Sequence, residues 1–215
     1  MFSQLELTNT LFLVVVTVIV SIVAMDNKEL FHRLKFNPYM VNKKKEYSRL
    51  FSHGLIHSGW LHLGVNMYVL WEFGRAVELF FSAPVVMGEW ARYGKFLYVL
   101  MYVMALPLAS LPALIKRKND ASYNAVGASG AVSAVVFSAI LFAPAQKLRF
   151  ILLPFFDIPA YVLGVGYLIY SYIMTKRGNS RIAHDAHFVG ALFGILFPLI
   201  LNIHLAERFI HQILK

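Results

Sequence analysis

The sequence has no cysteine among its 215 residues, which excludes a disulfide scaffold, a cysteine-ligated zinc site and a cysteine nucleophile. Charged residues are also scarce, at 14% against about 25% in an average soluble domain. No repeat of about 20–50 residues is visible, which excludes a solenoid. Hydrophobic residues make up 59%, against the usual value of about 45–50%. A disordered chain is therefore excluded, and a water-soluble single domain is disfavoured.

Acidic residues are few: 11 Asp and Glu stand against 20 Lys and Arg, for a formal net charge of +9. A nucleic-acid-binding domain would gather such a charge on one folded surface. Here the basic residues lie between long apolar runs, which favours contact with lipid headgroups. We therefore expect membrane lipids, and no nucleic acid, as partners.

Six apolar stretches are long enough to be considered as membrane spans. A transmembrane helix needs about 20 residues to cross a hydrocarbon core of about 30 Å. The stretches cover residues 9–25, 59–81, 96–115, 125–143, 150–174 and 186–205. Because the alternating strands of a membrane barrel are not visible, these are predicted to be helices. We predict an all-α polytopic membrane protein with one six-helix domain over residues 1–215.

The connections between the spans carry two further expectations. The leader before the first span holds Glu6 and no Lys or Arg, so we expect a retained span rather than a signal peptide. The long connection 26–58 combines the basic run Lys43–Lys45 with several apolar side chains. Such a mixture is typical of a loop that lies in the membrane interface, and a solvated loop is the alternative.

The second span, 59–81, is the richest in polar side chains, which are costly inside a bilayer. His62 and Asn66 are four residues apart and therefore share one helical face. Near the far end of this span are three charged residues at i,i+3 spacing, which we expect to pair with one another in a structural role: Glu72, Arg75 and Glu78.

Ser129 and His187 are expected to lie near one membrane face. Their spans, the fourth and the sixth, run in the same direction because one span separates them. Ser129 lies about four residues into its span and His187 one residue into its own, so their depths differ by roughly 5 Å at most. The second span has the same direction, which places His62 and Asn66 at this face as well.

This set of side chains suits acyl transfer to water. A serine hydroxyl needs a base to take its proton, and the neutral imidazole of His187 can do so near pH 7. The Asn66 amide and the His62 ring N–H are donors that could stabilise an oxyanion. Asp185 stands two residues before His187, and i,i+2 positions do not face each other on a helix. A Ser–His dyad is therefore favoured over a triad.

Glycines accompany these residues. Gly127 and Gly130 leave the backbone around Ser129 free to form a tight turn. Gly190 and Gly194 follow His187 at a spacing of four, which allows two helices to approach closely in a membrane.

Three strings, HSGWLHLGVNM, GASGAVSAV and AHFVGALFG, stand in this order at the starts of the second, fourth and sixth spans. Together they resemble the rhomboid family of intramembrane serine proteases over about residues 10–205. The residues that match the family pattern are His57, His62, Asn66, Gly127, Ser129, Gly130, His187, Gly190 and Gly194.

The resemblance implies that Ser129 is the nucleophile and His187 the general base. Asn66, His62 and the backbone amide of Ser129 would form the oxyanion site, and His57 would be structural at the start of the second span. No metal and no other cofactor is implied. The substrates would be single-span or other transmembrane proteins, cleaved in or beside a helix that carries small or helix-weakening residues.

The sequence departs from the family pattern at two positions near this set. Ser133 stands where some bacterial members carry an aromatic side chain that stacks on the catalytic histidine. Ser48 stands before Arg49, where a tryptophan often precedes the arginine of the interfacial first loop.

Other functions remain as alternatives. The first is a non-catalytic rhomboid-like protein that binds membrane proteins without cleaving them. A second is a histidine-rich metal site, for which His57, His62, His184 and His187 are too few and no HExxH motif exists. A transporter would need an inverted repeat or broken helices, and neither is visible.

Membrane orientation is the point on which two arguments disagree. The resemblance implies cytoplasmic termini and a catalytic face outside. However, 13 of the 20 Lys and Arg residues lie on catalytic-side connections, among them Lys176, Arg177 and Arg181. The positive-inside rule would turn that face inward. We favour the extracytoplasmic orientation, because charges in an interfacial loop count less than charges in free loops. By analogy, the compact core suggests a prokaryotic plasma membrane.

Overall fold

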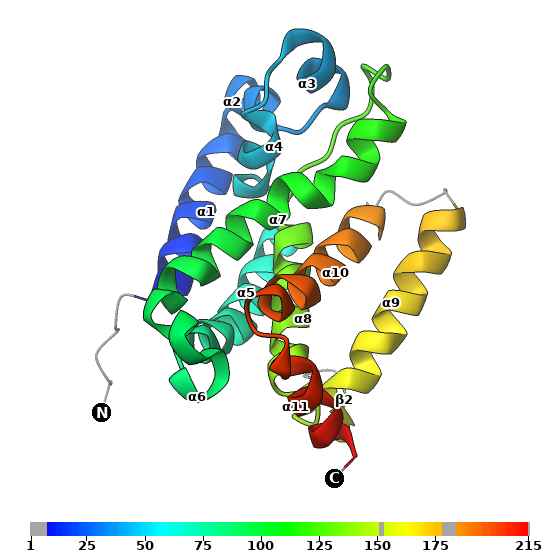
Figure 1. Cartoon of the computed structure of the whole chain (residues 1–215). Helices are drawn as coiled ribbons and strands as arrows, with labels where there is room; N and C mark the ends of the chain where they lie inside the picture. The colour runs from blue at the N-terminus through cyan, green and yellow to red at the C-terminus, as the bar shows by residue number, and fades with distance from the viewer. Residues whose placement is uncertain (1–7, 151–152, 178–183, 215) are drawn as a thin grey trace.

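The computed structural model describes residues 8–150, 153–177 and 184–214; the leader with Glu6 and the loop with Arg181 lie outside these ranges. The chain folds as a bundle of helices in which α8 occupies the centre (Figure 1). The six long helices are α1 (Asn9–Asp26), α5 (Trp60–Phe81), α7 (Gly94–Lys116), α8 (Ser129–Phe142), α9 (Ala160–Arg177) and α10 (His184–Leu201). The remaining elements are α2 (Lys28–Leu34), α3 (Pro38–Lys44), α4 (Arg49–Ser52), η1 (His53–Leu55), α6 (Pro84–Met87), η2 (Gly88–Tyr93), β1 (Lys147–Phe150), β2 (Leu153–Pro159) and α11 (His204–Ile213).

The all-α membrane architecture is confirmed, and three of the expected span boundaries are wrong. The fourth span was expected over 125–143, but α8 begins at Ser129, which is therefore its first residue. The fifth span was expected over 150–174, but α9 begins at Ala160, because β1 and β2 form an antiparallel hairpin before it. The sixth was expected to reach residue 205, but α10 ends at Leu201. A break at Asn202 then separates α10 from α11, whose sequence is amphipathic rather than continuously apolar.

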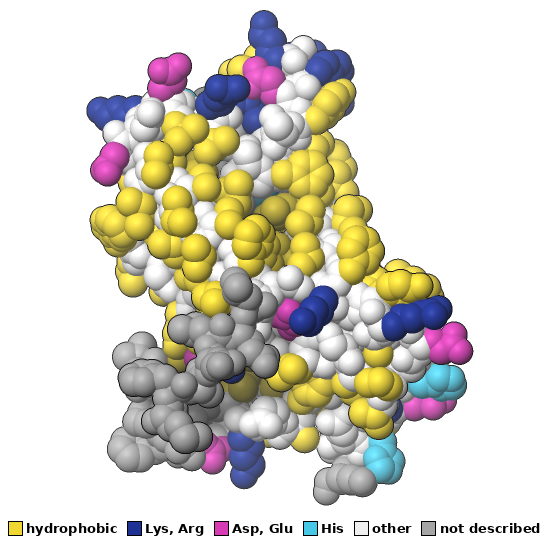
Figure 2. Space-filling model, turned by 90° about the vertical axis from the view of Figure 1, so that its left-hand side faces the viewer, with side chains coloured by type: hydrophobic (Ala, Val, Ile, Leu, Met, Phe, Trp, Pro, Cys, Tyr) yellow, Lys and Arg dark blue, Asp and Glu magenta, His cyan; other side chains and the backbone are white. Residues whose placement is uncertain are grey.

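The chain is an integral, multi-pass membrane protein. Within the described residues, three helical segments are long and apolar enough to cross a membrane: Asn9–Asp26, Pro84–Lys116 and His184–Leu201. Ser129–Phe142 and Ala160–Thr175 are apolar but shorter. On the α1 side of the molecule, apolar side chains form a broad band, with charged groups gathered above and below it (Figure 2).

Helix α8 is short because protein, not lipid, surrounds it. It has 14 residues, 11 of them buried, and spans about 21 Å at 1.5 Å per residue. Its neighbours are α5, α7, α9, α10 and α11. A helix enclosed in this way need not cross the full hydrocarbon thickness, so Ser129 at its first turn can lie below the membrane face.

Two glycines of α10 bring it against α8. A Cβ at Gly190 would collide with the backbone oxygen of Gly130, and one at Gly194 with that of Ala134. The Ser138 hydroxyl donates a 2.6 Å hydrogen bond to the Gly194 oxygen. The glycine spacing thus produces the close approach that the sequence predicted.

The connection 26–58 folds into α2, α3 and α4. The buried guanidinium of Arg49 joins α4 to α2, since its Nη1 donates to the backbone oxygens of His32 and Lys35, each at 2.8 Å. Phe36 pairs with Ala125 by two backbone hydrogen bonds of 3.0 Å. The first loop is therefore attached to the segment that precedes Ser129.

The expected pairing of Glu78 with Arg75 is wrong. The buried carboxylate of Glu78 accepts hydrogen bonds from the amides of Asn9 and Thr10, at 3.0 and 3.2 Å, and from the Thr10 hydroxyl at 3.0 Å. It therefore satisfies donors in the first turn of α1, where a negative charge also suits the helix dipole. Arg75 is exposed and lies over the ring of Trp71.

Candidate active site

The segment between α7 and α8 reaches Ser129 through a glycine with a positive φ. Gly127 has a φ of +111°, which L side chains rarely adopt. A Cβ at this position would also lie 2.7 Å from Cε1 of His62. The Gly127 amide donates a 2.9 Å hydrogen bond to the backbone oxygen of His53. Glycine is therefore required here both by the backbone conformation and by the ring against it.

A second turn shapes the start of this segment. The Asp120 carboxylate accepts hydrogen bonds from the hydroxyl and the amide of Ser122, at 2.6 and 3.0 Å. The hydroxyl bond lowers the pKa of Asp120 below its ordinary value, and the nearby Arg117 acts in the same direction. The carboxylate therefore stays ionised and holds the turn near neutral pH.

Ser129 and His187 are in direct contact. Nε2 of His187 lies 2.6 Å from Oγ of Ser129. The two residues stand in the first turns of α8 and α10, which begin at the same end of the bundle (Figure 1). Both side chains are half-buried. With the ring proton on Nδ1, the Ser129 hydroxyl donates to Nε2, the arrangement that a serine and its base require.

The start of α8 supplies backbone donors beside this pair. The first intrahelical hydrogen bond of α8 runs from the Val132 amide to the oxygen of Ala128. The amides of residues 129–131 therefore have no acceptor within the helix, and the helix dipole favours a negative charge near them.

The expected side-chain donors lie on the adjoining helix α5. The amide of Asn66 donates one N–H to the backbone oxygen of His62 at 2.8 Å and retains a second. Nδ1 of His62 lies 3.0 Å from the hydroxyl of Ser58, while the Cε1–Nε2 edge of the ring faces Gly127. With the hydroxyl donating to Nδ1, the ring carries its proton on Nε2, toward Gly127.

His57 connects α1 with residues 127 and 128, which precede Ser129. The hydroxyl of Ser21 in α1 donates to the Leu55 oxygen at 2.8 Å and lies 3.0 Å from Nδ1 of His57. The single hydroxyl proton is used by Leu55, so Nδ1 carries the proton and Nε2 is free to accept. The Ala128 amide donates to this Nε2 at 3.4 Å. The fully buried His57 thus contacts the residue before Ser129, rather than only the start of α5 as expected.

The Asp185 carboxylate is directed away from His187. One oxygen accepts a 2.9 Å hydrogen bond from the Ala186 amide, and the other lies 3.7 Å from Nζ of Lys116. Across the part of the chain that the structure describes, no carboxylate is hydrogen-bonded to His187, and no three His, Asp or Glu side chains are grouped to hold a metal ion.

Tyr167 is the residue that sequence reasoning missed. Its ring, carried by α9, is stacked on that of His187, with an interplanar angle of 21° and 6.5 Å between centroids. Its hydroxyl lies 3.3 Å from the hydroxyl of Ser133. The sequence contains no signal for this contact, because α9 carries several tyrosines and only its rotation in the bundle selects one.

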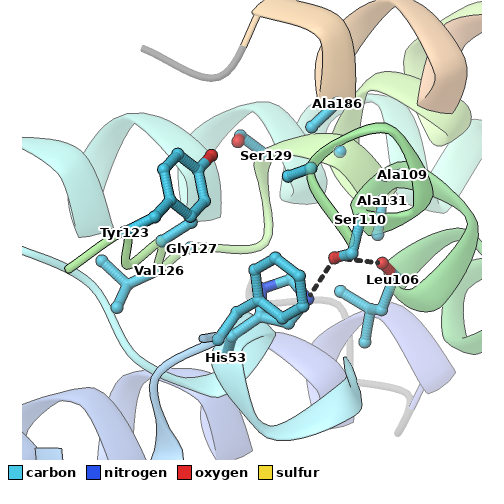
Figure 3. Close-up of a pocket in the computed structure, with 14 residues that line it drawn as sticks. His53, Leu106, Ala109, Ser110, Tyr123, Val126, Gly127, Ser129, Ala131 and Ala186 are labelled. Carbon is cyan, nitrogen blue, oxygen red and sulfur yellow. Dashed lines mark hydrogen bonds between the residues drawn. The ribbon is translucent and has the colours of Figure 1, made fainter. Parts of the chain in front are cut away.

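A small pocket adjoins Ser129. Its volume is about 40 Å³, and its lining includes His53, Ser110, Tyr123 and Gly127. The hydroxyl of Tyr123 points toward that of Ser129 (Figure 3). Burial raises the pKa of Tyr123 above its ordinary value, and the Asp185 carboxylate acts in the same direction, so this hydroxyl keeps its proton.

The sequence is similar to proteins of one known family. Presenilin-associated rhomboid-like protein, mitochondrial, from Rattus norvegicus is 26% identical over 142 residues, which are 66% of this chain and 34% of that protein. The protein of the same name from Homo sapiens is 25% identical over the same length. The chain therefore spans about a third of the length of these curated relatives. The family model described as Rhomboid domain matches residues 44–203, which include Ser129, His187 and all of α5 to α10, and the chain belongs to the rhomboid family.

Proposed function

We propose that this chain is an intramembrane serine endopeptidase that cleaves transmembrane protein substrates with a Ser129–His187 dyad. The observation that carries the proposal is the 2.6 Å contact between Oγ of Ser129 and Nε2 of His187. The helices that carry these two side chains begin 55 residues apart in the sequence, at Ser129 and His184, and neither helix needs the contact in order to form.

In the first step, Oγ of Ser129 attacks the scissile carbonyl carbon while its proton passes to Nε2 of His187. The carbonyl oxygen becomes an oxyanion. The free amides at the start of α8, the second N–H of Asn66 and the Nε2–H of His62 are the donors available to it. His57 and Gly127 act indirectly, by holding the segment that presents Ser129.

In the second step, the C–N bond breaks and the imidazolium of His187 donates its proton to the leaving amine. An acyl ester on Ser129 remains. A water molecule then attacks this ester, with His187 as its base, and releases the new carboxyl end and the Ser129 hydroxyl. Neither step uses a metal or another cofactor.

The substrate must expose its backbone to Ser129. A continuous helix keeps its carbonyls hydrogen-bonded, so small or helix-weakening residues at the cleaved position would favour local unwinding. The pocket beside Ser129 supports this expectation. Its volume of about 40 Å³ is small against the roughly 150 Å³ cavity that accommodates benzene.

Reaction with a fluorophosphonate probe tests the proposal directly. We expect the purified protein, in lipid vesicles, to be labelled, and mass spectrometry of the digest to place the adduct on Ser129. The probe requires an activated serine, so an ordinary hydroxyl such as that of Ser122 serves as the internal control. A folded protein that stays unlabelled and cleaves no transmembrane substrate would overturn the proposal in favour of the non-catalytic, client-binding alternative.

The orientation of the catalytic face is a further prediction, and we propose that it is extracytoplasmic. The chain lacks cysteine, so single cysteines can report on each side. Lys44→Cys in α3 and Glu207→Cys in α11 lie at opposite ends of the bundle, and both side chains are exposed (Figure 1). We expect a membrane-impermeant maleimide to label only Lys44→Cys in intact bacterial cells, and Glu207→Cys after permeabilisation. The reverse pattern would show that the basic residues, and not the family topology, determine orientation.

The comparisons do not support the prokaryotic plasma membrane that the compact core suggested, because the relatives named above are mitochondrial proteins.

Of the basic residues that enter the orientation argument, Arg181 lies outside the described residues, as do the side chains of Lys176 and Arg177.

A further inference from the structure

Three contacts from two helices fix the ring of Tyr167. Its ring is stacked on that of His187 of α10, with 6.5 Å between centroids, and is tilted by 44° against the ring of Phe137 of α8, with 5.8 Å between centroids. Its hydroxyl lies 3.3 Å from that of Ser133 of α8. The side chain is half-buried. An aromatic ring with a packing neighbour, a stacking neighbour and a hydrogen-bond partner has little freedom to rotate.

The imidazole of His187 needs such a support. Its Nε2 must stay in line with Oγ of Ser129 as the proton moves, and its other nitrogen has no carboxylate to fix the ring among the described residues. In a triad, that carboxylate would orient the imidazole. The ring contacts of His187 are with Tyr167, which is nearly parallel to it, and with His184, which meets it edge-on at 6.1 Å.

We propose that Tyr167 is a positioning residue for His187 and is itself held in place by Ser133. Its ring, carried by α9, would orient the imidazole as the carboxylate of a triad does. The inference rests on the proposed protease function. It also explains why this chain has a serine at position 133, where some bacterial members of the family carry an aromatic side chain. A small side chain at this position leaves space for the Tyr167 ring, and its hydroxyl provides the hydrogen-bond partner for the phenol.

A glycine in α9 allows the contact between Tyr167 and Ser133. Gly164, one turn before Tyr167, is buried against α8, and a Cβ there would lie 3.0 Å from Cδ1 of Ile140. Without a side chain at 164, α9 can approach α8 closely enough for the Tyr167 hydroxyl to reach Ser133.

The test compares ring removal with hydroxyl removal. In Tyr167→Leu we expect kcat, and the rate of fluorophosphonate labelling, to fall about tenfold with KM within about twofold of wild type, because orientation and not binding is impaired. Tyr167→Phe keeps the stacked ring and should stay within about threefold of wild type. Tyr172→Leu is the matched control, since Tyr172 lies on the same helix with its ring against Phe188.

The role of Ser133 is tested by a double-mutant cycle. Ser133→Ala should resemble Tyr167→Phe, and the two together should lose no more than either one, because both remove the same hydrogen bond. Losses that multiply would show that Ser133 acts independently. A folded Tyr167→Leu as active as wild type, a Tyr167→Phe as impaired as Tyr167→Leu, or an equal loss in Tyr172→Leu would each overturn the proposal.

A spectroscopic readout separates this proposal from the proposed function. In protein labelled with ¹⁵N-histidine, the ring signals of His187, assigned by their absence in His187→Ala, should move in Tyr167→Leu and remain in place in Tyr172→Leu. This measurement requires no activity. If the wild-type protein does not react with the fluorophosphonate and the His187 signals still move in Tyr167→Leu, the protease function is contradicted and the Tyr167–His187 contact is supported. If the His187 signals do not move in Tyr167→Leu, the positioning role of Tyr167 is contradicted.

Discussion

Replacement of Ser129 by alanine is expected to abolish proteolysis, with kcat reduced by about 10⁴- to 10⁶-fold, the range typical of serine proteases that lose a dyad or triad member. His187→Ala should lose a comparable factor, because a serine without its base is a poor nucleophile. The double variant should lose no more than either single one, since the two residues act as a unit. The measurement is cleavage of a transmembrane substrate reconstituted with the enzyme in lipid vesicles.

His211→Ala provides the control for this prediction, because His211 is an exposed residue of α11. It should cleave at the wild-type rate. Residual cleavage in Ser129→Ala at more than a few per cent of wild type would contradict the assignment of the nucleophile.

The same dyad determines how the rate depends on pH. Protonated His187 has no lone pair on Nε2 and cannot take the proton of Ser129. The rate should therefore fall as pH is lowered through the titration of this histidine and recover fully on return to neutral pH. A rate that stays flat from about pH 8 to about pH 3, in protein that remains folded, would contradict the role of His187 as base.

Gly194→Leu is expected to be the most disruptive of the packing substitutions. The new side chain would collide with the backbone of Ala134, and rigid backbone cannot move aside as a flexible side chain can. Overpacking typically costs about 1–3 kcal/mol, and a clash with backbone lies at the upper end of this range. The Ser138 hydrogen bond to the Gly194 oxygen would be lost with it. Thermal unfolding in detergent, followed by circular dichroism, measures the effect.

The matched control for this substitution is Gly166→Leu on α9, where a Cβ would meet nothing within 4 Å. This variant should unfold within a degree or two of wild type, since a leucine there adds apolar surface to a membrane helix at no steric cost. Equal destabilisation of the two variants would show that the close approach of α8 and α10 is not what Gly194 provides.

The proximity of Ser129 and His187 was predictable because it depends on features that sequence carries directly. The number of spans between Ser129 and His187 determines that their helices run in parallel, and their distance from each span start determines depth. Both inferences use only hydropathy and helix rise. The 2.6 Å contact in the structure agrees with them.

The boundary of the fifth helix was not predictable by the same means. Residues 147–159 are nearly as apolar as a span, and a hydropathy average does not distinguish a strand from a helix. Pro154 and Pro159 are the local signals against a helix beginning at 150. The hairpin displaces the start of α9 by ten residues from its expected position.

Contacts between side chains of different helices were the least predictable part. Glu78 bonds to the first turn of α1, 68 residues away from Thr10 along the chain, because that turn has free amides and no acidic residue of its own. Tyr167 meets His187 because of how α9 is rotated. Neither contact leaves a periodic pattern in the sequence, so both had to be observed.

The hydrogen bonds that link Ser21, His57 and Ala128 indicate how far the protein could be truncated and remain active. The family model begins at residue 44, whereas Ser21 of α1 is the partner that leaves Nε2 of His57 free to hold the Ala128 amide. A fragment trimmed to the matched segment would retain both members of the dyad and lose the residue that sets the tautomer of His57. We therefore expect the smallest active fragment to be larger than the region by which the family is recognised, and to include the first helix.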